Sequence, residues 1–161
     1  MNTDTHPDTT ITADPAVPAI HIEREFDAPP AAVFRAHTDP ELVKQWLGPR
    51  RLTMRIEKWE PVTGGGYRYV HFGEDGVEHE FFGSFHELRE PGRLVQTFTY
   101  AGYPDSVALE TMTLEDLGGR TRMHIVSLFG SVAERDGMLS SGMDEGVVDG
   151  YEQLDELLAR S

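Results

Sequence analysis

The pair of residues with the clearest chemical potential is a histidine that a predicted hairpin places opposite a carboxylate. Glu74 and Asp75-Gly76 separate two strand-like segments, and Asp-Gly suits the two central positions of a tight hairpin turn. This turn predicts a register in which His71 faces Glu80. A carboxylate opposite an imidazole raises the basicity of the histidine and fixes its tautomer, as a general base requires. An ordinary cross-strand pair on a wet surface is the commoner use of such residues and stays open as the alternative.

The same register divides this hairpin into two faces of mixed composition. One face carries Tyr67, Tyr69, His71, Glu80, Phe82, Ser84, His86 and Leu88, and the other carries Arg68, Val70, Phe72, His79, Phe81, Gly83 and Phe85. Tyrosines and histidines beside apolar groups are typical of a ligand cavity with a few orienting polar atoms, so we expect the first face to point inward. With neighbouring elements included, the expected ligand-binding residues are Trp46, Tyr67, Tyr69, His71, Phe82, His86, Gln96, Phe98, Glu110, Met112, Met143 and Gly146.

Metal and cofactor motifs are absent from the sequence. The seven histidines show no HxH or HExxH spacing, and there is no cysteine to supply a thiolate ligand or a disulfide. The three glycines at 64–66 lack the spacing and the lysine of a phosphate-binding loop. We therefore expect no metal site and no cofactor.

A long amphipathic helix over residues 131–160 is predicted to position the candidate residues. Its apolar side chains fall on one stripe of about 120° at a helical period, and Ser131 with Glu134 fits a capping box at its start. Gly146 and Gly150 interrupt the stripe, although each glycine costs about 1 kcal/mol relative to alanine within a helix. Either a strand approaches the helix closely there, or the missing side chains leave a cavity.

The remainder of the chain reads as strands with two short helices near the start. Residues 1–18 are rich in Thr, Asp and Pro without periodicity, which predicts a flexible leader, and residues 19–161 form a single domain. Proline at a first helical position predicts helices over 30–38 and 40–46. About seven antiparallel strands are expected over 19–27, 51–59, 67–72, 78–88, 94–100, 106–114 and 121–129.

Composition restricts the partners. The 28 acidic and 14 basic residues among 161 give a net charge of −14, which disfavours binding to nucleic acid or an anionic membrane. No apolar run approaches the roughly 20 residues that span a bilayer, and the N-terminus lacks the pattern of a signal peptide. We expect a cytoplasmic protein.

The order of elements and four sequence blocks resemble the helix-grip fold of the START-like, or SRPBCC, superfamily. The blocks are EFDAPPAAVFRAHTDPELVKQWLGP (25–49), GSFHELREPGRLVQTF (83–98), GGRTRM (118–123) and RDGMLSSGMDEGVVDGYEQLDELL (135–158). Within the superfamily, the chain looks like the branch named after the activator of the heat-shock chaperone ATPase. The resemblance implies an α+β fold with a curved sheet wrapped on the long C-terminal helix and a pocket between them. Gln45 stands where family members commonly have a second aromatic residue near the cavity mouth.

Members of this superfamily bind lipids, hormones and polyketides, catalyse cyclisations or contact chaperones, so the resemblance implies three hypotheses. The first is a binding module for a small hydrophobic or aromatic ligand. The second is a cofactor-independent enzyme of the polyketide cyclase or hydrolase kind, with His71 and Glu80 as the base. The third is an interaction protein that assists a chaperone ATPase. Homodimerisation stays open in all three.

Overall fold

The computed structural model of the chain describes residues 3–5 and 8–160. Its strands are β1 (Thr3–Thr5), β2 (Thr9–Ala13), β3 (Ala19–Phe26), β4 (Thr53–Trp59), β5 (Gly66–Phe72), β6 (Glu78–Arg89), β7 (Arg93–Tyr100), β8 (Ala108–Asp116) and β9 (Thr121–Leu128). Its helices are α1 (Pro30–Thr38), α2 (Pro40–Val43), α3 (Val132–Leu139) and α4 (Met143–Ala159).

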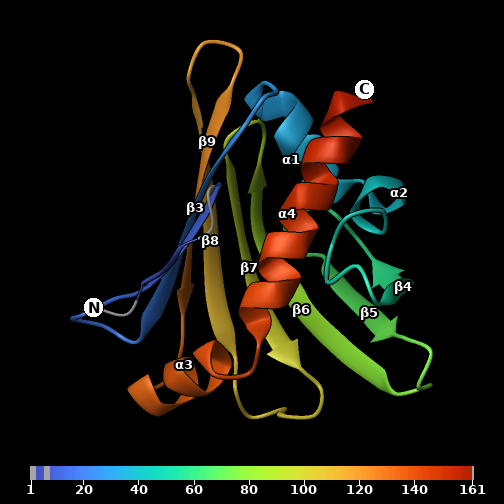
Figure 1. Cartoon of the computed structure of the whole chain (residues 1–161), viewed down its shortest axis with the longest axis vertical. Coiled ribbons are helices and arrows are strands. Elements are labelled where there is room, and N and C mark those ends of the chain that lie inside the picture. Colours follow the sequence, from blue (N-terminus) through green and yellow to red (C-terminus); the bar gives the residue numbers. More distant parts are fainter. Residues whose placement is uncertain (1–2, 6–7, 161) are drawn as a thin grey trace.

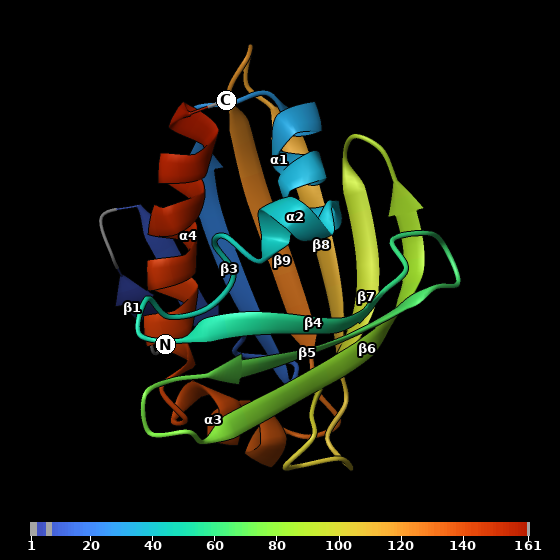
Figure 2. The same ribbon diagram turned by 90° about the vertical axis from the view of Figure 1, so that its right-hand side faces the viewer.

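The nine strands of the described residues form one antiparallel sheet in the order β1-β2-β3-β9-β8-β7-β6-β5-β4. Figure 1 shows that the sheet curves around α4, which lies along its concave side. Figure 2, turned by 90°, shows α1 and α2 beside α4 in front of the sheet. The predicted α+β helix-grip fold is confirmed. The seven predicted strands correspond to β3 to β9, and each predicted strand end lies within two residues of the observed one.

The first helix, α1, is held at its C-terminal end by the two tryptophans of the chain. Asp39 caps α2, because its side chain accepts a hydrogen bond from the Glu41 amide. The indole N–H of Trp46 donates to the Ala36 carbonyl over 2.9 Å, and that of Trp59 donates to the Thr38 carbonyl over 2.7 Å. Both carbonyls lie in the last turn of α1, where helical partners are missing. The tryptophans therefore fix α1 to the chain segment that follows it.

The C-terminal region forms two helices where the sequence predicted one. The predicted capping box is present, since the Ser131 hydroxyl accepts from the Glu134 amide at the start of α3. The chain then turns at Gly142, whose φ of 88° lies in the left-handed region that glycine adopts without strain. This break separates α3 from α4 and lets α4 follow the sheet.

The segment 1–18, predicted as a flexible leader, forms strands at Thr3–Thr5 and Thr9–Ala13, while residues 1–2 and 6–7 of it lie outside the described residues. Strand β2 pairs with β3 in an antiparallel register, and β1 pairs with β2. The side chains of Thr9 and Ile11 are buried, and the Thr9 hydroxyl accepts a hydrogen bond from Arg24. Pairing with β3 satisfies the backbone of a segment whose composition alone favoured disorder.

The buried apolar side chains form two separate clusters. The larger one lies between β3, β8 and β9 on one side and α1 and α4 on the other. The smaller one consists of Tyr67, Tyr69 and Phe85 on β5 and β6. Two partly buried residues, Leu47 and Leu88, pack against both clusters. Among the described residues, no helix has the length and apolar character that a membrane crossing requires.

Candidate functional site

The β5–β6 hairpin has a register one residue away from the predicted one. His71 pairs with His79 and Val70 pairs with Glu80, so the predicted opposition of His71 and Glu80 is wrong. The loop spans residues 73–77, with a hydrogen bond from the Gly76 amide to the Gly73 carbonyl, and is longer than a two-residue turn. Because side chains alternate along a strand, a shift of one residue moves the β6 side chains to the opposite face. This holds as far as the irregularity between Phe85 and Glu87, after which Leu88 faces inward as predicted.

The shift puts three predicted site residues on the outer face of the sheet. Glu80 forms an ion pair with Arg68 at 3.0 Å, and the Arg68 guanidinium lies 4.6 Å from the centre of the Phe82 ring. His86 is exposed on the same strand. Phe82 and His86 are therefore not ligand-binding residues of the interior, and among the described residues no carboxylate acts on His71 as the sequence predicted.

The expectation that Tyr67, Tyr69 and His71 point inward is correct. They are 3%, 5% and 6% exposed, and their rings are in contact along β5. On β6, Phe81 lies directly opposite Tyr69 and stacks on it, while Phe85 is tilted against Tyr67, whose own partner in the register is Gly83. The result is a wall of aromatic side chains on the inner face of β5 and β6.

His71 is enclosed at the edge of this wall. A hydrogen bond to the Leu47 backbone holds the imidazole, while its Nε2 is buried and has no partner among the described residues. A Cβ atom at Gly48 would lie 2.5 Å from the ring, so only glycine fits at that position. Burial lowers the pKa of His71, which keeps the ring neutral near pH 7.

A polar ladder crosses the middle of the concave face. Gln96 on β7, Glu110 on β8 and Ser127 on β9 are directly opposite one another in the register. The Gln96 amide and the Ser127 hydroxyl each donate to a different oxygen of the Glu110 carboxylate, both over 2.9 Å. Burial raises the pKa of Glu110, and the two hydrogen bonds only partly oppose this effect. The ladder thus places one carboxylate inside an apolar surface.

Three tyrosines lie within the electrostatic range of Glu110. Burial, with the Glu110 charge as a further cause, raises the pKa of Tyr67, Tyr69 and Tyr151. The Tyr67 hydroxyl donates to the Thr97 carbonyl over 2.6 Å. Within the described part of the chain, the hydroxyls of Tyr69 and Tyr151 have no hydrogen-bond partner. They are donors that an additional molecule could use.

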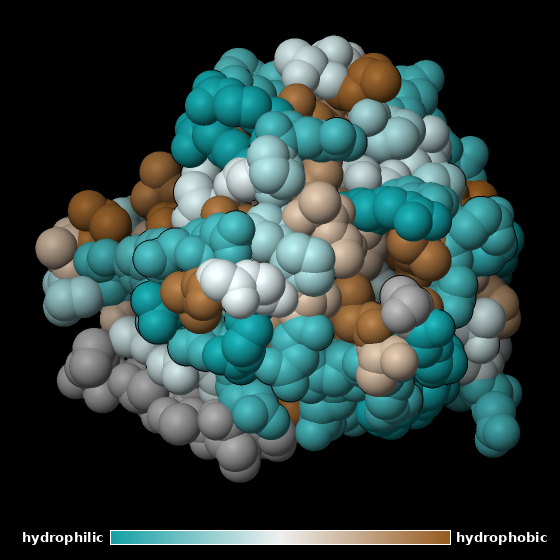
Figure 3. Space-filling view, turned by 90° about the horizontal axis from the view of Figure 1, so that it is seen from above, coloured by the Kyte–Doolittle hydropathy of each residue, from teal (hydrophilic) through white to brown (hydrophobic). Residues whose placement is uncertain are grey.

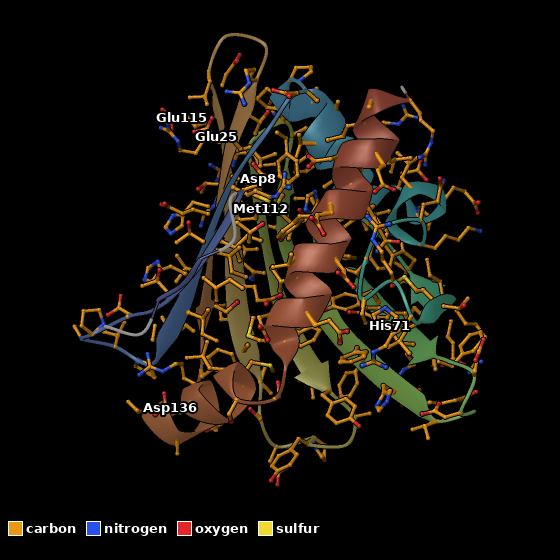
Figure 4. The ribbon with its side chains drawn as sticks, viewed as in Figure 1. Asp8, Glu25, His71, Met112, Glu115 and Asp136 are labelled. Carbon is orange, nitrogen blue, oxygen red and sulfur yellow. The ribbon has the colours of Figure 1, made fainter. Side chains whose placement is uncertain are left out.

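Several inward-facing residues near the ladder keep partial access to solvent. Gln96, Phe98 and Glu110 lie on central strands opposite α4, yet each is only partly buried, as are Met143 and Val147 on α4 itself. Met112 is 3% exposed within the larger cluster, and Figure 4 shows it between the sheet and α4. Phe98, Met143 and Val147 pack against the larger cluster while keeping this partial exposure.

Trp46, predicted as a ligand-binding residue, packs between α1 and α4. It is 4% exposed, donates its indole N–H to α1 and stacks on Tyr151 at 5.7 Å between ring centres. Tyr151 was not among the predicted site residues, although it follows Val147 by four positions and so continues the apolar stripe. Trp46 and Tyr151 together close the space between α1, α4 and the sheet.

The glycines of α4 permit close approach of a loop rather than of a strand. A Cβ at Gly150 would lie 3.2 Å from the Trp46 carbonyl oxygen, and one at Gly146 would lie 3.4 Å from Pro49. The Gln153 amide donates to the carbonyls of Trp46 and Gly48, which fixes the loop on the helix. Gly146 therefore contacts the loop and does not line the interior.

His37 on α1 is a further buried titratable group, and no sequence pattern pointed to it. Its Nδ1 donates to the Val33 carbonyl over 2.8 Å, and its ring meets Trp46 edge to face at 4.8 Å. Its Nε2 is buried without a partner among the described residues. Burial lowers the pKa of His37 to about 4, so the imidazole is neutral near pH 7.

A separate groove of about 740 Å³ lies outside this interior, where the end of α4 meets β2, β3 and β9. Its lining is mostly charged, and these charges pair with each other: Arg24 with Asp155, and Arg120 with Glu25. Figure 3 views the molecule from above, where hydrophilic residues cover most of the surface and leave smaller hydrophobic areas between them. No group of three or more His, Asp or Glu side chains in the described ranges could hold a metal ion.

Comparison with known families agrees with this geometry. A family model described as "Activator of Hsp90 ATPase homolog 1-like protein" matches residues 27–159. The chain belongs to this family. Its match runs from the end of β3 to the end of α4 and so includes the polar ladder and the aromatic wall. A comparison with curated proteins gives no match.

Solved structures show the same fold in bacterial proteins. A protein from Rhodobacter sphaeroides is 27% identical with a TM-score of 0.87, covering 96% of this chain and 99% of its own. A protein from Arthrobacter aurescens is 29% identical with a TM-score of 0.85, covering 94% and 91%. A protein from Mycobacterium smegmatis, at 23% identity and a TM-score of 0.84, covers 94% and 97% and shows the fold alone.

Proposed function

We propose that this member of the family binds a small, largely apolar or aromatic molecule between the concave face of the sheet and α4. One observation carries the proposal. Gln96, Phe98 and Glu110 face α4 from the central strands and are still only partly buried. In a closely packed domain these positions would be filled by neighbouring side chains. A ligand would complete this packing.

The composition of the surrounding surface supports such a ligand. The aromatic wall of β5 and β6 continues onto β7 through Phe81 and Phe98, whose rings stack at 5.5 Å. On the opposite side, Met143 and Val147 of α4 present adaptable apolar surface. Small-molecule sites typically combine such walls with a few polar groups, here Glu110 and the unpaired tyrosine hydroxyls.

The first experiment is identification of a retained molecule. The purified protein is denatured, and the extract is analysed by mass spectrometry. In parallel, thermal unfolding is measured with fatty acids, sterols, aromatic polyketides and flavonoids. A ligand at 100 times its dissociation constant adds about 2.7 kcal/mol to the free energy of unfolding, which is readily measured as a shift in Tm. An empty extract together with no shift in Tm would count against the proposal.

Filling the interior provides a second, structural test. Val147→Phe introduces a larger side chain on the face of α4 that packs on the core cluster, and Val148→Phe introduces the same side chain outside that cluster. If the interior is incompletely packed, Val147→Phe is tolerated and abolishes ligand stabilisation, whereas Val148→Phe retains it. In a filled core, Val147→Phe would destabilise the protein by about 1–3 kcal/mol through overpacking.

A further inference from the structure

We infer that the molecule held on this inner face is an organic amine whose protonated nitrogen binds the Glu110 carboxylate. The inference rests on the proposed function and names the chemical class of its ligand. It depends on the charge balance of the polar ladder, on the residues around it and on the position of Glu110 relative to α4.

Glu110 lacks a cationic partner within the described part of the chain. Its two hydrogen bonds come from neutral groups, the Gln96 amide and the Ser127 hydroxyl. The buried arginine of the inner face, Arg24, is bound to Asp155 over 2.7 Å at the far end of α4. A charge that has lost part of its hydration on an apolar face is normally paired, because the loss is otherwise compensated only by neutral groups. A ligand cation would supply the missing charge.

The carboxylate also has unused hydrogen-bond capacity. An ionised carboxylate accepts about four hydrogen bonds through its two oxygens, and Glu110 receives one on each. A protonated primary amine is a compact donor of three hydrogen bonds and suits this arrangement better than a hydroxyl group, which donates one. A charge-assisted hydrogen bond is also about twice as strong as a neutral one.

The surroundings of Glu110 favour a cation attached to an apolar body. Tyr67, Tyr69 and Tyr151 are close enough for the Glu110 charge to raise their pKa values. Tyrosine rings attract cations through their negative π faces and pack well against aromatic or aliphatic groups. The net charge of −14 further increases the local concentration of cations around the protein.

Matched amines and alcohols test the inference directly. Tryptamine and tryptophol share one indole-ethyl body, and phenethylamine and phenethyl alcohol share a smaller one. Dissociation constants for all four compounds are measured by calorimetry with the wild-type protein. We expect each amine to bind at least about tenfold more tightly than its alcohol, a difference of about 1.4 kcal/mol.

Two variants of β8 separate the inner carboxylate from general surface charge. Glu110→Gln keeps the size of the side chain and removes its charge, and it should abolish the preference for amines. Glu115→Gln removes the same charge from the outer side of the same strand, where the carboxylate pairs with Arg122 at 3.2 Å. Figure 4 shows Glu115 on the side of the sheet away from α4. This control should keep the full preference.

A pH series with the wild-type protein gives a measurement that needs no variant. Burial raises the pKa of Glu110, so this carboxylate becomes protonated at a higher pH than an ordinary surface carboxylate. The preference for amines should therefore decline at that higher pH during acidification. Equal binding of amine and alcohol at neutral pH would overturn the inference and leave the proposed function intact. Binding of none of the four compounds would also overturn the inference, and the proposed function falls with it only if the extract is empty and the compound panel gives no shift in Tm.

Discussion

Arg24 on β3 and Asp155 on α4 form a two-point ion pair, with nitrogen–oxygen distances of 2.8 and 2.7 Å. Arg24 is 3% exposed, and two of its three remaining N–H groups donate to the Thr9 hydroxyl and the Glu25 carbonyl. A guanidinium at this depth is stable only with most of its donors satisfied. The pair therefore fastens the last turns of α4 to the sheet and also holds β2 in place.

Removal of the carboxylate should destabilise the fold. Asp155→Asn leaves the buried Arg24 without its charged partner, and Asp8, at 3.9 Å, compensates only in part. We expect the free energy of unfolding to fall by about 1–3 kcal/mol, as for a buried donor that loses its partner. Urea denaturation measures this change. Glu156→Gln is the control, because its pair with Arg50 is exposed on both sides; an equal loss there would contradict the prediction.

The two glycines of α4 that meet the loop should respond differently to alanine. At Gly146 the added methyl group would be in ordinary contact with Pro49, so the higher helix propensity of alanine should raise stability by up to about 1 kcal/mol. At Gly150 it would press on the backbone at Trp46 and Gly48, which Gln153 holds in place. We expect Gly150→Ala to be less stable than Gly146→Ala by about 1–2 kcal/mol. Equal Tm values for the two variants would refute the close-approach interpretation.

Most of the fold could be predicted because its signals are local. Alternating apolar residues, Pro30 and Pro40 at helix starts and the glycines at 118–119 each specify an element without reference to distant residues. The errors occurred where a distant contact decides the structure. Strand β2 has little apolar content, and its order depends on pairing with β3 and on the bond between Thr9 and Arg24. Gly142 could be recognised as a helix break only from its φ.

The candidate site was predicted less completely, because it depends on a register and on tertiary neighbours. The predicted hairpin turn was shorter than the actual loop, and the resulting shift replaced Phe82 by Phe81 on the inner face. Gln96 and Glu110 were placed on the inner face by the alternation of side chains along their strands, which the predicted strand boundaries kept in the correct phase. Ser127 lies on the same inner face, but a single serine gives no signal of its partner before the three strands are aligned.

His37 should make stability depend on pH in a defined window. Its pKa is lowered from 6.5 to about 4 because the ring is buried. Below about pH 6.5 the unfolded chain gains a proton that the folded protein does not accept until about pH 4. Stability is therefore complete above this window and declines through it, by at most about 3 kcal/mol. Urea denaturation from pH 7 to 4 should show a smaller decline for His37→Gln, while His86→Gln, at an exposed position, should follow the wild type.

Glu110 should show the opposite pH dependence. Since burial raises its pKa in the folded state, ionisation opposes folding at neutral pH, and acidification through the raised pKa towards 4.5 removes this opposition. Glu110→Gln should therefore be more stable than the wild type at pH 7, and the difference should narrow as the pH falls. Glu115→Gln should show no such gain, because its carboxylate is exposed and paired with Arg122.

A ligand-binding residue commonly lowers the stability of the free protein, because natural proteins often have lower stability at functional positions. The proposed binding of an amine by Glu110 agrees with such a loss. A Glu110→Gln protein less stable than the wild type at pH 7 would show that the polar ladder serves the fold and not a ligand.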